Sequence, residues 1–300
     1  MHFPSVTFLI LLAAALGGLT PIIIKDGLRE ITPISFTLLR FLIAALVLIP
    51  ACAGSLKTML HKPGLKTLLL ASLGNVANVI LFAFGVRFIS PSLAQLLYLL
   101  GPVLTYCLSM SLLSETPSLR RTSGVLLGLS GATLAVVSGP DFSLNLNSRG
   151  NLGIGLILLA VLSHVSYTVI SKKVKLHFSP QEQTLLMSAL CILTLLVLLP
   201  FEPESLLTSA SKLSQRAWLA VIYSGAVATG LYYFLMQAVI RKASPVSAAS
   251  ILYVQIGFTF SWAALLYGER LHWLVFLGAA IAIAGAFMVS APAPLQAKGK

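Results

Sequence analysis

The chain has 300 residues, of which 57% are hydrophobic and 9% are charged, and its mean hydropathy is +0.95. Soluble domains carry about 25% charged residues, so this composition excludes a soluble enzyme and indicates a membrane protein. The formal charge of +12 does not indicate nucleic-acid binding, because the cations fall between apolar runs and do not gather on one face. The three cysteines lack the close spacing of a disulfide framework or a zinc site, so we expect no metal or other cofactor.

Ten apolar runs follow one another along the chain, each about as long as the roughly 20 residues that cross a bilayer as a helix. Backbone amides that face lipid must be hydrogen-bonded within their own segment, so each run predicts a helix. We therefore expect an all-α integral membrane protein. Its ten predicted spans are 5–24, 33–51, 65–86, 91–113, 120–138, 150–170, 180–199, 217–239, 245–267 and 272–290.

The cations in the short connections predict the orientation, because Lys and Arg are enriched on the cytoplasmic side. If the N-terminus is cytoplasmic, twelve cations lie inside and seven lie outside. Those inside are Lys57, Lys62, Lys66, Arg120, Arg121, Lys172, Lys173, Lys175, Arg241, Lys242, Lys298 and Lys300. Those outside are Lys25, Arg29, Arg87, Arg149, Lys212, Arg216 and Arg270. We expect a multi-pass protein of the cell membrane with both termini in the cytoplasm.

The chain contains an internal repeat. Landmarks from Ser90 through Glu115 recur from Ser244 through Glu269 at a constant offset of 154, and a weaker match at an offset of 147 relates Lys25 to Lys172. Each copy holds five spans, and two copies of an odd number of spans enter the membrane in opposite orientations, as in alternating-access transporters. The predicted units are a first five-helix repeat, a second inverted repeat and a cytoplasmic tail, at residues 1–139, 150–290 and 291–300.

Several short motifs resemble the EamA-like branch of the drug/metabolite transporter superfamily. They are Lys25 at the end of the first span, Arg40-Phe41 in the second, Pro102 in the fourth, Ser114-Glu115, and Gly268-Glu269-Arg270. The resemblance implies a ten-helix bundle in which the fifth and tenth spans are peripheral and the other eight surround a cavity. This sequence departs from a symmetric pattern at Ile256, where the offset of 154 would place a counterpart of Pro102. A proline-dependent kink is therefore not expected in both halves.

Polar residues on one face of the third and eighth spans predict the substrate cavity. Asn75 and Asn78 are three residues apart and so share a helix face, and the offset of 154 places Thr229 and Tyr232 at the matching positions. Polar groups inside a membrane span favour the bundle interior or a water-filled cavity. The alternative is that these side chains hold neighbouring helices together by hydrogen bonds.

Polar and aromatic residues at helical spacing also share one face of the fourth predicted span and one face of the ninth. The candidate cavity residues from these faces are Gln95 and Tyr98 in the first half, and Gln255 and Trp262 in the second. Their aromatic rings suit stacking on a planar or apolar ligand, although ordinary helix packing explains them equally well. Other candidates with less support are Tyr233, Gln237 and Tyr253.

Three ionisable residues lie within the predicted spans, and the sequence suggests specific roles for each. Arg40 lies seven residues into its span, about 10 Å below the outer surface, where it either attracts an anionic substrate group or anchors the helix. Histidine as a residue type titrates near neutral pH, so His164 is either a proton relay or a neutral hydrogen-bonded residue. Glu182, at the start of the seventh span, is the second candidate relay. No carboxylate lies near the middle of a predicted span, so we expect facilitated or exchange transport with weak dependence on a proton gradient.

Small residues form ridges on the fifth and tenth spans, at Gly124-x-x-x-Gly128 and at Gly278, Ala282 and Ala286. Such ridges allow close helix approach, and they predict packing within the bundle, with dimerisation as the alternative. The sequence therefore leaves open a monomer or a homodimer.

Together, these patterns predict the function of a secondary transporter, either an exporter or an exchanger, of small polar or amphiphilic metabolites. The sequence holds no nucleotide-binding P-loop pattern. An intramembrane enzyme would need clustered His, Asp, Glu or Cys residues, yet seven of the eight acids lie in connections. A membrane scaffold would leave the paired polar faces unexplained. The expected partners are a small-molecule substrate and membrane lipid, with no nucleic acid.

Overall fold

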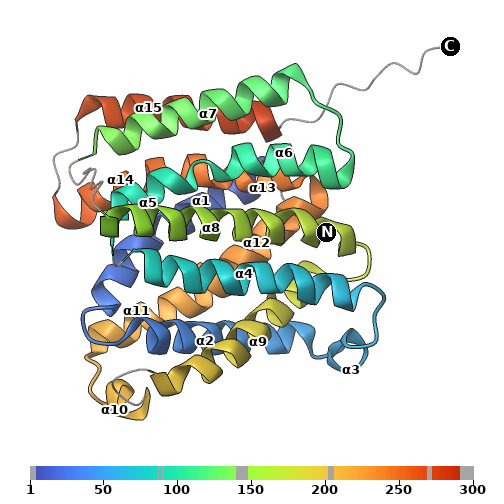
Figure 1. The fold of residues 1–300 in the computed structure, drawn as a ribbon, viewed down its shortest axis with the longest axis vertical. Coiled ribbons are helices and arrows are strands. Elements are labelled where there is room, and N and C mark those ends of the chain that lie inside the picture. Colours follow the sequence, from blue (N-terminus) through green and yellow to red (C-terminus); the bar gives the residue numbers. More distant parts are fainter. Residues whose placement is uncertain are drawn as a thin grey trace.

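Helices account for all the regular secondary structure in the described part of the computed structural model, which covers residues 5–86, 88–89, 91–139, 148–201, 206–268 and 272–290. Most helices run side by side in one bundle (Figure 1). The first half contains α1 (Val6–Gly27), α2 (Pro33–Cys52), α3 (Leu56–Met59), α4 (Leu65–Gly85), α5 (Pro91–Tyr98), α6 (Gly101–Leu113) and α7 (Leu119–Val137). The second half contains α8 (Ser148–Ser171), α9 (Pro180–Leu198), α10 (Leu206–Ser211), α11 (Gln215–Gly225), α12 (Tyr232–Lys242), α13 (Pro245–Ala249), α14 (Ile251–Tyr267) and α15 (Trp273–Ser290). Shorter turns are the 3-10 helices η1 (Lys172–Val174) and η2 (Leu199–Phe201), and the π-helical segment η3 (Ala226–Leu231).

Nine helical stretches among the described residues are long and apolar enough to cross a membrane. They confirm the prediction of an all-helical protein with several membrane spans. The predicted span 120–138 corresponds to α7, which is helical over 19 residues but is not among the nine. Its first turn contains Arg120 and Arg121, which lower its hydropathy.

Some residues used in the sequence argument lie outside the described residues. They are Arg87, Ser90, Asp141, Glu202, Glu204, Glu269, Arg270 and the predicted tail 291–300, and the side chain of Lys25 is also not described.

The two ends of the bundle are named here by a residue at each. At the Lys62 end, α2 and α12 end and α4 and α9 begin, whereas at the Asp26 end α1 ends and α2 and α11 begin. Helix starts follow ordinary capping rules, and α9 shows this most fully. Its N-cap Ser179 accepts a hydrogen bond from the Glu182 backbone N–H at 3.4 Å, and the Glu182 carboxylate accepts one from the Ser179 N–H at 2.8 Å.

The spans that contain α5–α6 and α13–α14 are each interrupted. The first break lies at Leu99 and Leu100, directly before a helix that has Pro102 in its first turn. The second lies at Ser250, whose hydroxyl donates to the Ser247 carbonyl at 2.8 Å. The span that contains α13 and α14 is therefore interrupted even though Ile256 stands where Pro102 has its counterpart. A serine that bonds to the backbone also bends a helix.

Helices α7 and α15 lie together at one edge of the bundle (Figure 1). Their glycines bring the two backbones into direct contact: a Cβ atom added to Gly285 would lie 2.3 Å from the Gly128 backbone nitrogen, and one added to Gly131 would lie 2.4 Å from that of Ala282. The two predicted small-residue ridges thus pack against each other inside one chain, which confirms the packing interpretation.

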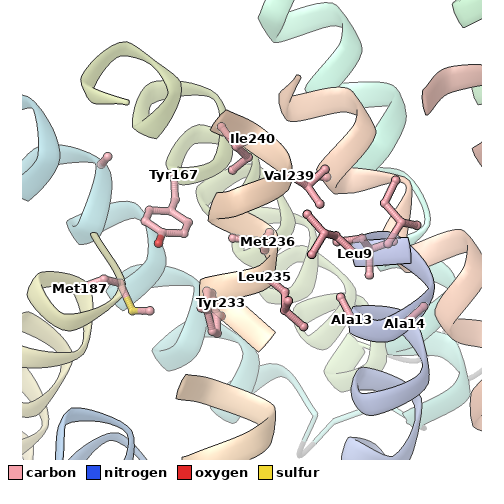
Figure 2. Packing of buried hydrophobic residues seen from close by; sticks show 14 of the residues in the cluster. Leu9, Ala13, Ala14, Tyr167, Met187, Tyr233, Leu235, Met236, Val239 and Ile240 are labelled. Carbon is pink, nitrogen blue, oxygen red and sulfur yellow. The ribbon is translucent and has the colours of Figure 1, made fainter. Parts of the chain in front are cut away.

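Apolar side chains join the two halves in the middle of the bundle. Figure 2 shows Leu9 and Ala13 of α1 facing Leu235 and Val239 of α12. The outward surface is also apolar, as is usual where a bundle faces lipid. Examples are Leu46, Val197 and Leu265, which are 66%, 70% and 75% exposed.

We expect Gly285→Ala to destabilise the protein by about 1 to 3 kcal/mol, because the added methyl group overpacks the contact between α7 and α15. The measurement is thermal unfolding in detergent. The matched control is Gly155→Ala, since a Cβ atom at Gly155 meets nothing within 4 Å. Equal melting temperatures for the two variants would show that the α7–α15 contact is not tight.

Candidate functional site

Asn75 of α4 is fully buried, and its side chain contacts three helices of the second half. Its side-chain oxygen accepts a hydrogen bond from the Tyr233 hydroxyl at 3.2 Å and lies 3.4 Å from His164 Nδ1. Its amide nitrogen donates to the Met187 sulfur at 3.1 Å. A buried amide without partners is costly, so these contacts fix the position of α4 against α8, α9 and α12.

Aromatic rings extend this contact along α12. The Tyr233 ring meets the rings of Tyr167 and Tyr232 edge-on, with centroid distances of 6.2 Å and 5.7 Å. The Tyr167 hydroxyl accepts a hydrogen bond from Gln237 Nε2 at 2.8 Å. Figure 2 shows Tyr167, Met187 and Tyr233 approaching from three different helices. We define the central polar cluster as these contacting residues: Asn75, His164, Tyr167, Met187, Tyr233 and Gln237.

Arg40 of α2 is held by the π-helical segment η3. Its Nε donates to the Thr229 hydroxyl at 2.6 Å, and that hydroxyl donates to the Ser224 carbonyl at 2.7 Å. The guanidinium makes no ion pair with any carboxylate among the described residues. The bond to Thr229 agrees with the interpretation that Arg40 anchors its helix. A guanidinium without a carboxylate partner among the described residues also agrees with the interpretation that Arg40 attracts an anionic substrate group.

Asn78, three residues after Asn75, faces a different set of helices. Its amide nitrogen donates to the Tyr98 hydroxyl of α5 and to the Ala160 carbonyl of α8, the latter at 3.0 Å. The Tyr98 ring also meets Phe82 edge-on at a centroid distance of 5.6 Å. Both asparagines therefore contact α8, but only Asn75 reaches α12.

The offset of 154 relates Thr229 and Tyr232 to Asn75 and Asn78 as matching positions of the two halves, and it predicts no bond between them. In the structure Tyr233, a secondary candidate in the sequence, bonds to Asn75, and Tyr232 lies beside it. The π-helical segment η3 directly precedes both tyrosines, and a π-helical turn holds more residues than an α-helical turn. The side chains after η3 are therefore rotated relative to a continuous α-helix.

The ninth-span candidates lie against α1. Trp262 donates its indole N–H to the Ala15 carbonyl at 3.1 Å. A Cβ atom on Gly17 would lie 2.6 Å from Gln255 Oε1 and 2.8 Å from the Tyr232 ring, so Gln255 and Tyr232 meet at the same glycine. Gln95 is half-buried on α5, and no hydrogen bond between described residues joins it to the central polar cluster.

Met187 is the member of the cluster that the sequence did not single out. It looks like an ordinary apolar residue of α9, and its role as an acceptor for Asn75 depends on a tertiary contact. Thioether sulfur is a weak acceptor, so no pattern in the sequence signals this bond.

At the Lys62 end, Glu182 is buried, and both of its carboxylate oxygens accept hydrogen bonds. Lys62 Nζ lies 2.7 and 2.8 Å from its two carboxylate oxygens, and the same carboxylate caps α9. This ion pair joins the connection before α4 to a helix of the second half. The roles of Glu182 and His164 as proton relays remain predictions.

At the Asp26 end, polar contacts again join the two halves. Arg216 of α11 lies 2.7 Å from the Asp26 carboxylate, and the Glu30 carboxylate accepts hydrogen bonds from the backbone N–H and the hydroxyl of Ser214, both at 2.8 Å. The two Ser214 bonds hold the pKa of Glu30 below its usual range. A lowered carboxyl pKa means that this contact stabilises the fold at neutral pH and weakens as the pH falls through the lowered value.

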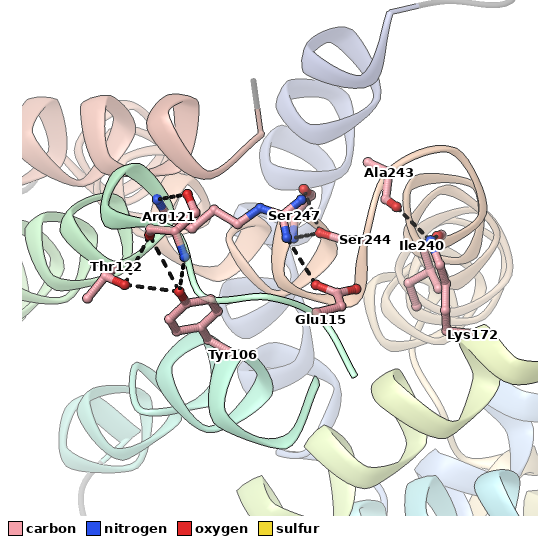
Figure 3. A network of polar contacts seen from close by, with 10 residues as sticks. Tyr106, Glu115, Arg121, Thr122, Lys172, Ile240, Ala243, Ser244 and Ser247 are labelled. Atoms are coloured by element: carbon pink, nitrogen blue, oxygen red, sulfur yellow. Dashed lines mark hydrogen bonds and ion pairs between the residues drawn. The ribbon is translucent and has the colours of Figure 1, made fainter. Parts of the chain in front are cut away.

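A second group of polar contacts lies at the Lys62 end, further from the centre (Figure 3). Lys172 donates to the carbonyls of Ile240 and Ala243, the latter at 2.6 Å, and so caps the last turn of α12. In the same view, Arg121 pairs with Glu115 at 3.1 Å. These contacts give Glu115, one of the motif residues, a structural role. Among the described residues no group of three or more His, Cys, Asp or Glu side chains suits a metal ion.

A family model described as the EamA-like transporter family matches this chain twice, at residues 5–137 and 151–291. A protein of Salmonella typhimurium named a probable amino-acid metabolite efflux pump is 28% identical, over 94% of this chain and 93% of its own length. An Escherichia coli protein of the same name is 26% identical over 93% of each chain, and an uncharacterized transporter of Bacillus subtilis is 27% identical over 87% of this chain and 83% of its own. These relatives are named as transporters or efflux pumps, as expected for a protein that is not an enzyme.

A crystal structure of a protein with 17% sequence identity superimposes with a TM-score of 0.79 and covers 94% of this chain and 95% of its own. That likeness shows a shared fold.

The Lys62–Glu182 ion pair predicts a measurable coupling energy. Glu182→Gln keeps a side chain that can cap α9 but leaves the Lys62 ammonium without its carboxylate. Because Lys62 is partly exposed, we expect a loss of about 1 to 3 kcal/mol in unfolding free energy. Thermal or denaturant unfolding of Lys62→Met, Glu182→Gln and the double variant completes the cycle. Additive losses in the double variant would mean that the pair contributes no coupling.

Proposed function

Because this chain belongs to the EamA-like transporter family, we propose that it is a secondary transporter that moves small polar or amphiphilic metabolites across the cell membrane by alternating access. The observation that carries the proposal is the central polar cluster, in which Asn75 joins α4 to three helices of the second half. Polar groups at this depth are found where a membrane protein binds or passes a polar solute.

The names of two relatives support a first substrate class to test. Two of them are named as probable amino-acid metabolite efflux pumps, so amino-acid metabolites are the first substrates to test and export is the first direction. The cluster offers an amide, an imidazole and phenol hydroxyls, which suit a solute with several hydrogen-bonding groups.

Alternating access in this proposal rests on two inverted five-helix repeats, α1 to α7 and α8 to α15, with α7 counted as a tenth span. The double match of the family model supports the duplication. The pairing of α7 with α15 supports it further, because each is the fifth span of its unit. In this proposal both termini lie in the cytoplasm, as the charge count of the connections predicts.

The polar contacts at the two ends suit such a carrier. The Lys62–Glu182 pair joins the halves at one end, and the Arg216–Asp26 pair joins them at the other. A carrier that opens first to one side and then to the other must release each set in turn. In our proposal these pairs are the contacts that hold each end closed.

We expect Asn75→Ala and Tyr232→Ala to reduce transport on the order of tenfold, because each removes a side chain from the path, while protein levels change little. The measurement is the flux of a labelled amino acid in vesicles, normalised to folded protein. Asn151→Ala is the matched control, since Asn151 is exposed at the start of α8. Normal flux in both test variants would show that α4 and α12 do not line the transport pathway.

Energy coupling is the second functional prediction. The four acids within the described residues, Asp26, Glu30, Glu115 and Glu182, lie at or beyond helix ends, so we propose facilitated or exchange transport. Vesicles with and without an imposed pH difference should then show the same final distribution of substrate.

The same assay includes His164→Ala and Glu182→Gln. Strong accumulation driven by the pH difference that disappears in one variant would identify that residue as the proton carrier. Accumulation that persists in both would point to a coupling route elsewhere. Either result would contradict uncoupled transport.

A further inference from the structure

A cavity of about 450 Å³ opens at the Lys62 end, away from the central polar cluster. It lies between the two halves, where α2 and α12 end and α9 begins. Its walls include Ala51, Lys62, His177, Gln181 and Arg241. Its volume falls within the usual range of ligand sites, about 300 to 1,000 Å³.

We propose that this cavity binds the headgroup phosphate of an anionic phospholipid. The cavity is level with the ends of α2, α9 and α12, which is where a bilayer places its headgroups. Basic pockets between membrane helices are known to hold such headgroups, since phosphate carries its charge on several hydrogen-bond acceptors.

The charges around the cavity favour an anion. Lys62 neutralises Glu182, so the one carboxylate in the wall does not repel phosphate. Arg241 is exposed and His177 is exposed, and neither has an ionic partner within the described residues. The planar guanidinium of Arg241 suits two parallel hydrogen bonds to one phosphate, and the Gln181 amide adds a neutral donor.

The apolar surface beside the cavity favours a lipid over a free anion. Val47 and Ala51 are four residues apart on α2 and so share one helix face, which runs from the lipid-facing surface to the cavity wall. Val47 is 51% exposed, and Leu176 at the rim is 80% exposed. A free phosphate would leave this apolar path uncovered, whereas the acyl chains of a phospholipid would lie along it.

The test uses the full-length protein, purified in detergent and stripped of lipid, in two parallel titrations with dioleoyl phosphatidylglycerol and dioleoyl phosphatidylcholine. A ligand that binds only the folded state raises the melting temperature, so thermal unfolding reports binding. We expect phosphatidylglycerol to raise the melting temperature and phosphatidylcholine to leave it nearly unchanged.

The variants separate this site from general charge attraction. Arg241→Gln should weaken the phosphatidylglycerol response about tenfold in lipid concentration, because it removes charged hydrogen bonds. Lys173→Gln is the matched control: it removes one exposed cation from the same end of the bundle, outside the cavity wall. If Arg241→Gln does not fold, His177→Gln takes its place.

Two results would overturn the proposal. An equal loss of response in Arg241→Gln and Lys173→Gln, or in neither, would show that the lipid effect is not localised to the cavity. A third titration with inorganic phosphate alone addresses the source of the anion. If phosphate raises the melting temperature as much as phosphatidylglycerol does, and blocks any further rise from the lipid, the site takes a soluble anion.

Discussion

The structure depends on how one buried amide in a membrane helix satisfies its hydrogen bonds. Asn75 is fully buried, and its oxygen and nitrogen take partners from α8, α9 and α12. Those contacts join α4 to the second half. Apolar residues such as Leu235 and Met236 pack in the buried cluster that also contains Tyr233 and Met187.

Close packing at the edge of the bundle complements this constraint. Helices α7 and α15 touch through Gly124, Gly131 and Gly285, where the facing backbone leaves no room for a side chain. In lipid, association of helices gains little from the hydrophobic effect and relies on such contact. A rigid pair at the edge leaves the polar contacts near the centre and at the two ends as the parts of the structure that a conformational change would break and remake.

Much of the fold follows from the sequence because a bilayer imposes a simple rule: an apolar run of the right length forms a helix. The rule does not capture local departures from α-helical geometry. The segment η3 rotates the later residues of its span relative to a continuous α-helix, and Tyr233, a secondary candidate in the sequence, is the residue that bonds to Asn75. The break at Ser250 occurs without a proline, and the Met187 contact with Asn75 has no sequence signal. The ion pair of Glu182 likewise depends on Lys62, a residue distant in the chain.

The contacts of the central polar cluster are weak ones, and this suits a transport path. Asn75 donates to a thioether sulfur and lies 3.4 Å from His164, a long separation for a hydrogen bond. Interhelical hydrogen bonds in membranes contribute about 0.6 kcal/mol each on average, so a solute that offers its own polar groups could replace them at small net cost. The ion pairs at the ends have shorter distances, 2.7 Å for both Lys62–Glu182 and Arg216–Asp26. In the carrier that we propose, the central contacts exchange partners readily, and the main energetic barrier of transport lies at the two ends of the bundle, where the charged pairs must separate.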